Sequence, residues 1–175
     1  MIKDLTLLKN RNGSALMRVI AAAIFFSAFS VSALNMGQMA PDFTLKSTQG
    51  VNLKLAEQRG QIIVINFWAS WCGPCRKEMP ILQSFHNKYK DLGVAVWGVN
   101  VEQNNQEGRD FLSDLKLNFP IFFDSSNTVS ANYQVEAMPT TVIVDRSGKV
   151  RYVFKGYRDG YEKKYAKAIK TLIRE

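Results

Sequence analysis

The sequence predicts an α/β fold with a mixed central sheet, and three observations point to it. Residues 62–68 and 94–101 are runs of apolar and β-branched residues, which is typical of strands buried on both faces. Each run is followed by a segment with helical spacing, 73–90 and 106–115, and this alternation favours parallel pairing. Residues 141–154 hold two β-branched runs around an Asp-Arg-Ser-Gly turn, which predicts an antiparallel hairpin.

The segment before the first central strand predicts a hairpin of its own. Polar and apolar residues alternate over 41–45, and a second short run, 51–53, follows the loop around Gln49-Gly50. Residues 55–59 suggest a short helical turn that ends at Gly60.

The helix expected over 73–90 presents one apolar side. Met79, Leu82, Phe85 and Tyr89 recur at spacings of three or four residues, so they share a face of an α-helix. We expect this face to pack on the sheet.

The second half of the chain continues the same pattern. After the helix 106–115 we expect a short strand over 121–123 and a helical turn over 128–133. The chain should end in an amphipathic helix over 161–173, whose apolar side is formed by four residues: Tyr165, Ile169, Leu172 and Ile173.

The first 33 residues have the pattern of a secretory signal peptide. Four basic residues precede an apolar run from Val19 to Val31, and Val31-Ser32-Ala33 offers a small-residue cleavage site. The run has about 13 residues, fewer than the roughly 20 that span a bilayer. We therefore predict cleavage after Ala33, one mature domain over 34–175, and a periplasmic or otherwise extracytoplasmic location. A retained membrane anchor is the alternative, and a lipid anchor is not indicated because the segment has no Cys.

The charge of the mature chain excludes an obvious nucleic-acid role. Removing residues 1–33 lowers Lys plus Arg from 23 to 19 and Asp plus Glu from 15 to 14, so the net charge falls from +8 to about +5. The remaining basic residues are dispersed, with a modest cluster at Lys163, Lys164, Lys167 and Lys170. Nucleic-acid binding calls for a basic groove with stacking aromatics, so a solvated helix face is the preferred interpretation, although attraction to acidic partners stays open.

The two cysteines carry the chemistry. Cys72 and Cys75 stand where the strand 62–68 passes into the helix 73–90, and they are too close together to close a stabilising loop. A helix amino end stabilises negative charge, so Cys72 should be the exposed, nucleophilic thiolate, and Cys75 should resolve the mixed disulfide. Gly73 permits the tight turn, and Pro74 has a backbone angle suited to a helix start.

Metal and haem sites fit this pair poorly. A zinc site needs about four ligands, but the sequence has no further Cys and a single His, His86. Covalent haem attachment requires His directly after the second Cys, where Arg76 stands. We expect neither a metal nor an organic cofactor.

Trp68-Ala-Ser-Trp-Cys-Gly-Pro-Cys75, with Pro80 five residues later, resembles the active-site motif of the thioredoxin superfamily. Residues 137–141, Ala-Met-Pro-Thr-Thr, resemble that family's second signature. The resemblance implies a three-layer fold, with a mixed central sheet and helices on both faces.

The same resemblance implies a substrate-binding surface. In the family the proline that matches Pro139 is cis and faces the two cysteines, and the backbone at Met138 would pair with an extended substrate peptide. Gly73 and Pro74 would border the substrate, and Trp71 would form part of the apolar docking surface. Packing in the core is the alternative for Trp71.

Three further features are similar to exported thioredoxin-like proteins typified by TlpA and ResA: the start of the hairpin at 40–43, the Cys-Arg-Lys-Glu-Met-Pro run at 75–80, and an insert at about 102–120. The resemblance covers nearly all of the mature chain. It implies an N-terminal β-hairpin extension, reduction of disulfides in protein substrates outside the cytoplasm, often in cytochrome c maturation, and a membrane thiol electron donor. We expect a monomer.

The chain departs from cytosolic thioredoxins at one acidic position. Thioredoxins carry a buried Asp before the motif, where this chain has Asn66, and Asn cannot accept a proton from the second thiol. TlpA-like proteins often supply a Glu near the insert, so Glu102 is our candidate, with a plain surface carboxylate as the alternative. The Gly73-Pro74 dipeptide is that of thioredoxin and favours a reductant.

Other functions stay open at this point. A disulfide oxidase or isomerase would use the same two cysteines, and a non-catalytic thioredoxin-fold module would bind chains without redox chemistry. A peroxidase is less well matched, because peroxiredoxins place Pro and Thr before their reactive Cys and this chain has Ser70-Trp71.

Overall fold

The computed structural model describes residues 34–175, which form a five-stranded mixed sheet. Its strands are β3 (Ile62–Trp68), β4 (Val94–Asn100), β5 (Ile121–Phe123), β6 (Thr140–Val144) and β7 (Val150–Lys155). Their order across the sheet is β5-β4-β3-β6-β7, with β3, β4 and β5 parallel and with β6 antiparallel to both β3 and β7. The predicted mixed sheet is confirmed. The predicted signal peptide, residues 1–33, lies outside the described residues.

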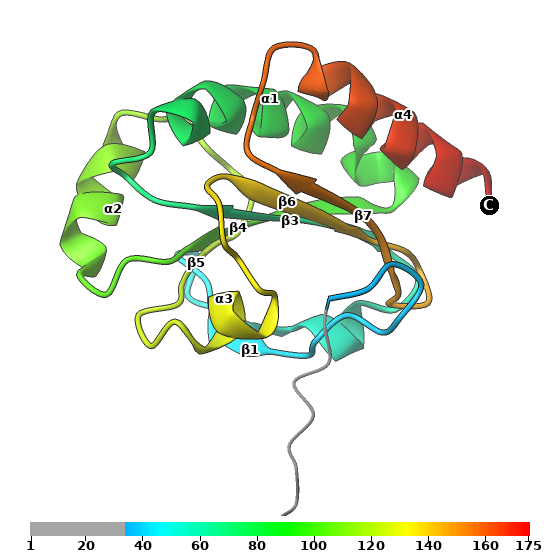
Figure 1. The fold of residues 1–175 in the computed structure, drawn as a ribbon, viewed down its shortest axis with the longest axis horizontal. Coiled ribbons are helices and arrows are strands. Elements are labelled where there is room, and N and C mark those ends of the chain that lie inside the picture. The colour runs from blue at the N-terminus through cyan, green and yellow to red at the C-terminus, as the bar shows by residue number, and fades with distance from the viewer. Residues whose placement is uncertain (1–33) are drawn as a thin grey trace, which may run out of the picture. The chain divides into compact units, whose positions relative to one another are not determined.

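Helices cover both faces of this sheet, as expected. They are α1 (Gly73–Tyr89), α2 (Asn105–Ser113), α3 (Thr128–Asn132) and α4 (Tyr161–Arg174), with short 3-10 helices η1 (Leu55–Gln58) and η2 (Lys90–Leu92). Figure 1 shows α1 and α4 on one side of the sheet and α3 on the other. The predicted N-terminal hairpin is formed by β1 (Thr44–Lys46) and β2 (Asn52–Lys54), on the α3 side.

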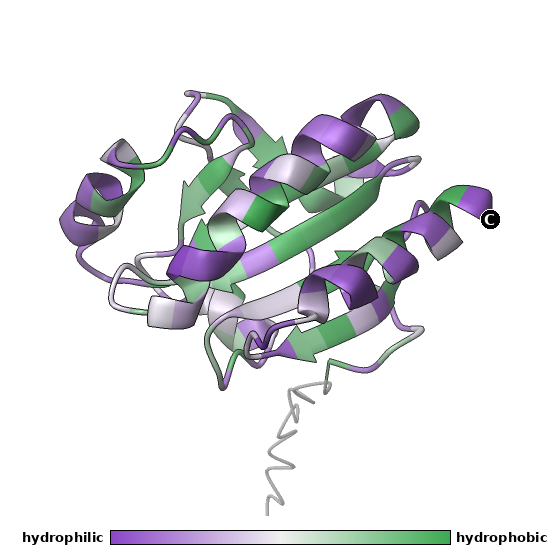
Figure 2. Ribbon diagram, turned by 90° about the horizontal axis from the view of Figure 1, so that it is seen from above, coloured by the Kyte–Doolittle hydropathy of each residue, from purple (hydrophilic) through white to green (hydrophobic). Residues whose placement is uncertain are grey.

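Strand β3 explains why the sheet has two cores. All seven of its residues are buried, and their side chains alternate between the two faces. Ile62, Val64 and Trp68 join the cluster under α1 and α4, and Ile63, Ile65 and Phe67 join the cluster under the hairpin and α3. Figure 2 shows the central strands as mostly hydrophobic and the helices as a mixture of hydrophilic and hydrophobic residues.

A glycine in β4 makes room for the residue that ends β3. A Cβ atom at Gly98 would stand 3.3 Å from the indole nitrogen of Trp68 and 2.5 Å from Cδ1 of Ile121. Only a residue without a side chain fits there, so Gly98 allows Trp68 and Ile121 to pack over the strand.

Most of the boundaries predicted from the sequence agree with the structure within one or two residues. The α2 helix ends at Ser113 and not at Leu115, because Leu115 N–H turns back to the carbonyl oxygen of Leu112. Within residues 34–175, no helix is both long enough and apolar enough to cross a bilayer.

Candidate active site

The two cysteines are joined by a disulfide bond at the amino end of α1. Cys72 is the residue that precedes the first helical turn, and its Sγ accepts a hydrogen bond from the Cys75 backbone N–H at 3.2 Å. Backbone N–H groups at a helix start carry partial positive charge and have no partner within the helix. The sulfur of Cys72 therefore lies where a negative charge would be stabilised.

Both cysteines are more enclosed than the sequence suggested. Cys72 is 4% exposed and Cys75 is 1% exposed, so neither cysteine projects into solvent and Cys72 is not the exposed residue that the sequence predicted. Cys72 lines a groove beside the disulfide bond.

This groove, of about 440 Å³, brings together four of the five residues predicted to bind substrate. Trp71, Gly73 and Pro74 line one side, and the segment 135–138, which ends in Met138, lines the other. Trp71 is 68% exposed, so its indole is free to contact another molecule. The Met138–Pro139 peptide bond is cis, as predicted, and the carbonyl oxygen of Pro139 accepts a hydrogen bond from Gly156.

A buried glutamate that the sequence analysis overlooked lies one helical turn after Cys75. The Glu78 side chain has no solvent exposure; it accepts hydrogen bonds from Asn66 Nδ2 and Thr141 Oγ1, both at 2.8 Å. Burial raises the pKa of Glu78, while the polar groups of Tyr165, Thr141 and Asn66 partly oppose the rise. The Tyr165 hydroxyl lies near the carboxyl but makes no hydrogen bond of good geometry.

Two signals in the sequence point to Glu78 in retrospect. Residues three apart share one face of a helix, so Glu78 had to follow Cys75 on the side that packs on the sheet. Asn66 stands where thioredoxins carry an Asp, and in the structure it is a hydrogen-bond donor to Glu78. Beside Asn66, where thioredoxins have a carboxyl on the strand, this chain has the carboxyl of Glu78 from α1, whereas the sequence analysis predicted Glu102 as the proton acceptor.

Glu102, the predicted proton acceptor, holds the loop before the cysteines. Its carboxylate accepts hydrogen bonds from Ser70 N–H at 2.8 Å, Ser70 Oγ at 2.6 Å and Asn100 Nδ2 at 2.6 Å. It is 9% exposed, so the alternative of a plain surface carboxylate is wrong. These hydrogen bonds attach the Glu102 side chain to Ser70, in the loop between β3 and Cys72. The role of Glu102 in proton transfer stays a prediction.

The described residues do not offer the cluster of side chains that a metal ion needs. Among residues 34–175 there is no group of three or more His, Cys, Asp or Glu side chains that could hold an ion. The two sulfurs are bonded to each other, and the carboxyl groups nearby have hydrogen-bond partners.

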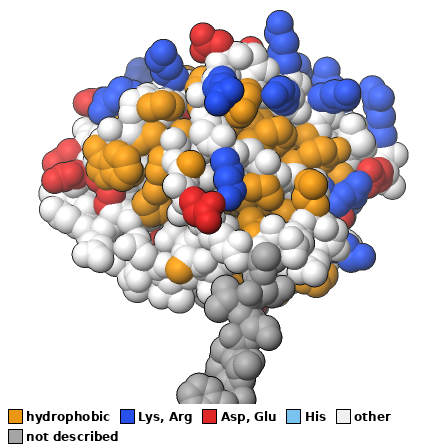
Figure 3. Space-filling model, in the orientation of Figure 1, with side chains coloured by type: hydrophobic (Ala, Val, Ile, Leu, Met, Phe, Trp, Pro, Cys, Tyr) orange, Lys and Arg blue, Asp and Glu red, His pale blue; other side chains and the backbone are white. Residues whose placement is uncertain are grey.

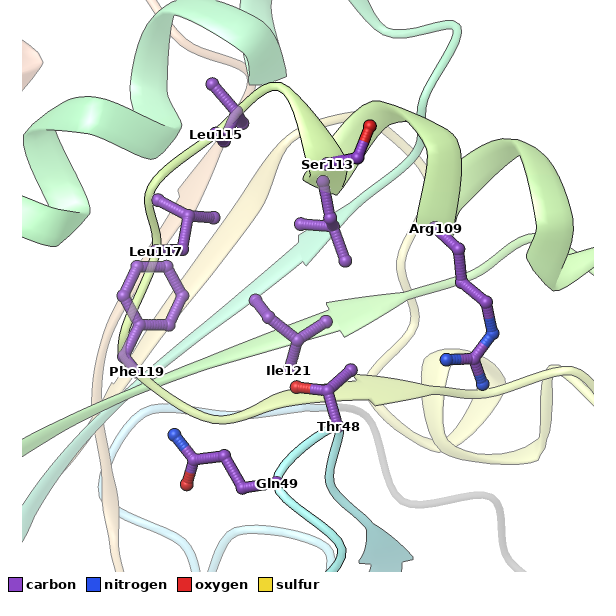
Figure 4. Close-up of a pocket in the computed structure, with 9 residues that line it drawn as sticks. Thr48, Gln49, Arg109, Ser113, Leu115, Leu117, Phe119 and Ile121 are labelled. Carbon is purple, nitrogen blue, oxygen red and sulfur yellow. The ribbon is translucent and has the colours of Figure 1, made fainter.

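A second cavity, of about 330 Å³, lies at the β5 edge of the sheet. Figure 4 shows apolar side chains from the segment after α2, Leu115 to Phe119, on one side, and Thr48 and Gln49 from the hairpin loop on another. Ile121 of β5 lies between them. None of the predicted site residues lines this cavity.

Comparison with known proteins gives one consistent result. The model of the AhpC/TSA family matches residues 36–153. The thiol-disulfide oxidoreductase ResA of Geobacillus kaustophilus is 33% identical over 148 residues, which cover 82% of this chain and 85% of that protein. ResA of Bacillus subtilis is 34% identical over 142 residues, which cover 81% of this chain and 78% of that protein. A solved structure from Chlorobium tepidum, described as a thiol:disulfide interchange protein DsbE, superposes with a TM-score of 0.77 at 33% identity and covers 81% of this chain and 99% of that one.

Proposed function

Because the chain belongs to the AhpC/TSA family and is a thioredoxin-like thiol–disulfide oxidoreductase, we propose that it is exported and reduces disulfide bonds in protein substrates. The observation that carries the proposal is the Cys72–Cys75 pair at the start of α1, with the buried carboxyl of Glu78 one turn behind it. Apocytochromes c are the substrate class we propose first, since the resemblance to TlpA and ResA points to them.

The first step uses the reduced protein. The Cys72 thiolate attacks one sulfur of a substrate disulfide, the substrate S–S bond breaks, and a mixed disulfide forms at Cys72. The released substrate sulfur takes a proton from solvent. The amino end of α1 supports this step because its N–H groups stabilise the attacking thiolate.

The second step releases the substrate. Cys75 gives its thiol proton to the Glu78 carboxylate, its sulfur attacks Cys72 Sγ, and the second substrate sulfur leaves as a thiolate. The substrate has gained two electrons, and the protein has the Cys72–Cys75 disulfide. A carboxyl whose pKa is raised by burial is a stronger base than an exposed one, which suits Glu78 to this transfer.

The direction of electron flow and the location of the protein are parts of the same proposal. The Gly73-Pro74 dipeptide supports a reductant, and the pattern of residues 1–33 supports export with cleavage after Ala33. A membrane-held dithiol would return the protein to its reduced state, and the protein would act as a monomer. Trp71, Gly73, Pro74, Met138 and Pro139 would contact the substrate chain.

Trapping the mixed disulfide tests the proposal directly. In Cys75→Ala the second step is blocked, so Cys72 should stay covalently attached to its substrates, which mass spectrometry of the exported fraction would identify. The control Cys72→Ala should trap at least about tenfold less, because the helix-end N–H of Cys75 donates to the sulfur of Cys72 and not to that of Cys75.

A reduction potential then separates the candidate directions. We expect a value near that of thioredoxin, about −270 mV, whereas an oxidase would lie near −120 mV. If trapping at Cys72 yields no protein adducts, or if the double variant Cys72→Ala, Cys75→Ala complements a null strain, the redox function is wrong and the binding module is favoured.

A further inference from the structure

Helix α4 carries a basic outer face that the redox chemistry does not use. Five cationic side chains on it are exposed, whereas Tyr165, Ala168, Ile169 and Leu172 form its buried side. We call the exposed set the α4 basic face: Lys163, Lys164, Lys167, Lys170 and Arg174. Figure 3 shows Lys and Arg side chains gathered along the upper edge of the molecule, where Figure 1 places α1 and α4.

The acidic residues of α4 do not neutralise this face. Glu162 bonds to the backbone N–H of Gly160 at the helix start, and Glu175 pairs with Arg151 at 2.6 Å beyond the helix end. Among residues 34–175, no carboxylate lies within ion-pair distance of any cation of the α4 basic face. The face is thus a stripe of uncompensated positive charge.

This stripe is unfavourable for the helix itself. Lys163 and Lys167 are four residues apart, as are Lys170 and Arg174, and like charges at that spacing destabilise a helix. Lys163 and Lys164 also lie in the first turn, where the helix dipole disfavours cations. The helix dipole favours only Arg174, in the last turn, so the stability of α4 does not explain the other four cations, whereas a partner with negative charge would.

The chemistry of the face indicates which partner. Lys163, Lys167, Lys170 and Arg174 line a shallow groove with Ala166 and Thr171, and the lining of this groove has no aromatic or large apolar side chain. Lys164, outside the groove, lies 4.6 Å from the centroid of the half-buried Tyr161 ring, the one aromatic beside the α4 basic face that makes a cation–π contact with it among residues 34–175. Protein interfaces depend on aromatic and apolar anchors, and single-stranded nucleic acid needs stacking rings. Four of the five cations are Lys, which acts as a mobile point charge and demands no fixed geometry. A fluid layer of phosphate groups fits these properties.

We propose that the α4 basic face docks the protein on an anionic phospholipid surface. Basic clusters gain free energy from the negative potential of such a surface, and the gain falls off within about 10 Å at ordinary salt. The helix begins next to the active-site end, since Tyr157 and Asp159 just before it share a groove with Gly73 and Pro74. Docking through α4 would hold the cysteines close to membrane-bound partners. This inference concerns a surface separate from the thiols, so it succeeds or fails independently of the redox function.

Vesicle binding by the full chain tests it. The variant Lys163→Glu, Lys167→Glu, Lys170→Glu is compared with wild type by sedimentation with phosphatidylcholine vesicles that do or do not contain phosphatidylglycerol. On the anionic vesicles we expect binding to fall at least about a hundredfold, since each of the three Lys residues contributes roughly a factor of five. On the neutral vesicles the two proteins should bind alike.

The matched control changes the same charge elsewhere. Lys46→Glu, Lys116→Glu, Lys149→Glu has the same net charge, and these three lysines are exposed on other elements. We expect its binding to the anionic vesicles to fall by less than about threefold, since these residues lie outside the α4 basic face. Both variants should reduce a soluble disulfide substrate at the wild-type rate, which shows that they are folded. Equal losses in the two variants, or wild-type binding that does not depend on phosphatidylglycerol, would overturn the proposal.

Discussion

Two buried glutamates flank the cysteines, and their surroundings differ in kind. Glu78 lies inside the core, where its hydrogen-bond donors are the side chains of Asn66 and Thr141 from two neighbouring strands. Glu102 lies at the end of β4, where its donors include the backbone N–H and hydroxyl of Ser70. The difference teaches that burial alone does not assign a role to a carboxyl group. Glu78 is on α1 itself, one helical turn after Cys75, and its donors come from the sheet, whereas the donors of Glu102 tie it to the loop before Cys72.

The largest effect we expect is on proton transfer at Glu78. Glu78→Gln keeps the size of the side chain but removes the base and leaves one acceptor oxygen where Asn66 and Thr141 donate to two. Release of substrate from Cys72 should therefore slow by about a hundredfold near pH 7. Single-turnover kinetics of mixed-disulfide release over a range of pH measure this rate. In wild type the rate should step up with pH as Glu78 loses its proton, and in Glu78→Gln this pH step should disappear.

The companion variant Glu102→Gln is the control for this comparison. It should keep the wild-type pH profile, because Ser70 and Asn100 hold Glu102 at the loop before Cys72, and we assign the transfer of the Cys75 proton to Glu78, one helical turn from that thiol. If Glu102→Gln loses the pH step and Glu78→Gln keeps it, the two roles are exchanged and the prediction made from the sequence is right.

An intermediate effect is expected on folding stability at Glu102. Glu102→Ala leaves the Ser70 N–H and the Asn100 amide without their acceptor, which costs about 1–3 kcal/mol of unfolding free energy. Urea denaturation of the oxidised protein measures it. Ser70→Ala is the smaller matched change, since it removes only the hydroxyl donor and should cost about 1 kcal/mol. If Ser70→Ala lost as much unfolding free energy as Glu102→Ala, the Ser70 N–H and the Asn100 amide would contribute nothing beyond the hydroxyl, which would contradict this prediction.

The smallest effect concerns the pH dependence of stability at Glu78. The folded-state pKa is raised above its ordinary value of 4.5, so between the two values the folded protein binds more protons than the unfolded chain. The stability should therefore fall as the pH rises from 4.5 to the raised pKa, by about 1.4 kcal/mol for each unit of the rise. Denaturation curves across this interval should show the fall in wild type and a flatter profile in Glu78→Gln. Parallel profiles would show that Glu78 does not titrate in that range.

The sequence was most informative where one property decides the structure. The strand Ile62–Trp68 was predicted with its observed bounds, because a continuous apolar run is buried on both faces whatever packs against it. The cysteine pair was equally clear, since its place between a strand and a helix is a local feature.

The sequence was least informative where a role depends on distant residues. Glu78 is preceded by Arg76 and Lys77, so its neighbours suggest an exposed helix surface, and only Asn66 and Thr141, 12 and 63 residues away, identify the buried site. The full burial of Cys72 depends likewise on the disulfide and on the shape of the groove. Helix ends such as Ser113 depend on local hydrogen bonds that compete with the apolar pattern.

The exposure of Trp71 has a practical consequence. The other two tryptophans, Trp68 and Trp97, are buried and should emit at short wavelengths, whereas Trp71 is open to water beside the disulfide. A substrate chain that covers its indole would dehydrate it and move the emission toward the blue. The protein therefore contains an intrinsic fluorophore at the groove where we propose that substrate docks, which would let substrate association be followed without an attached dye.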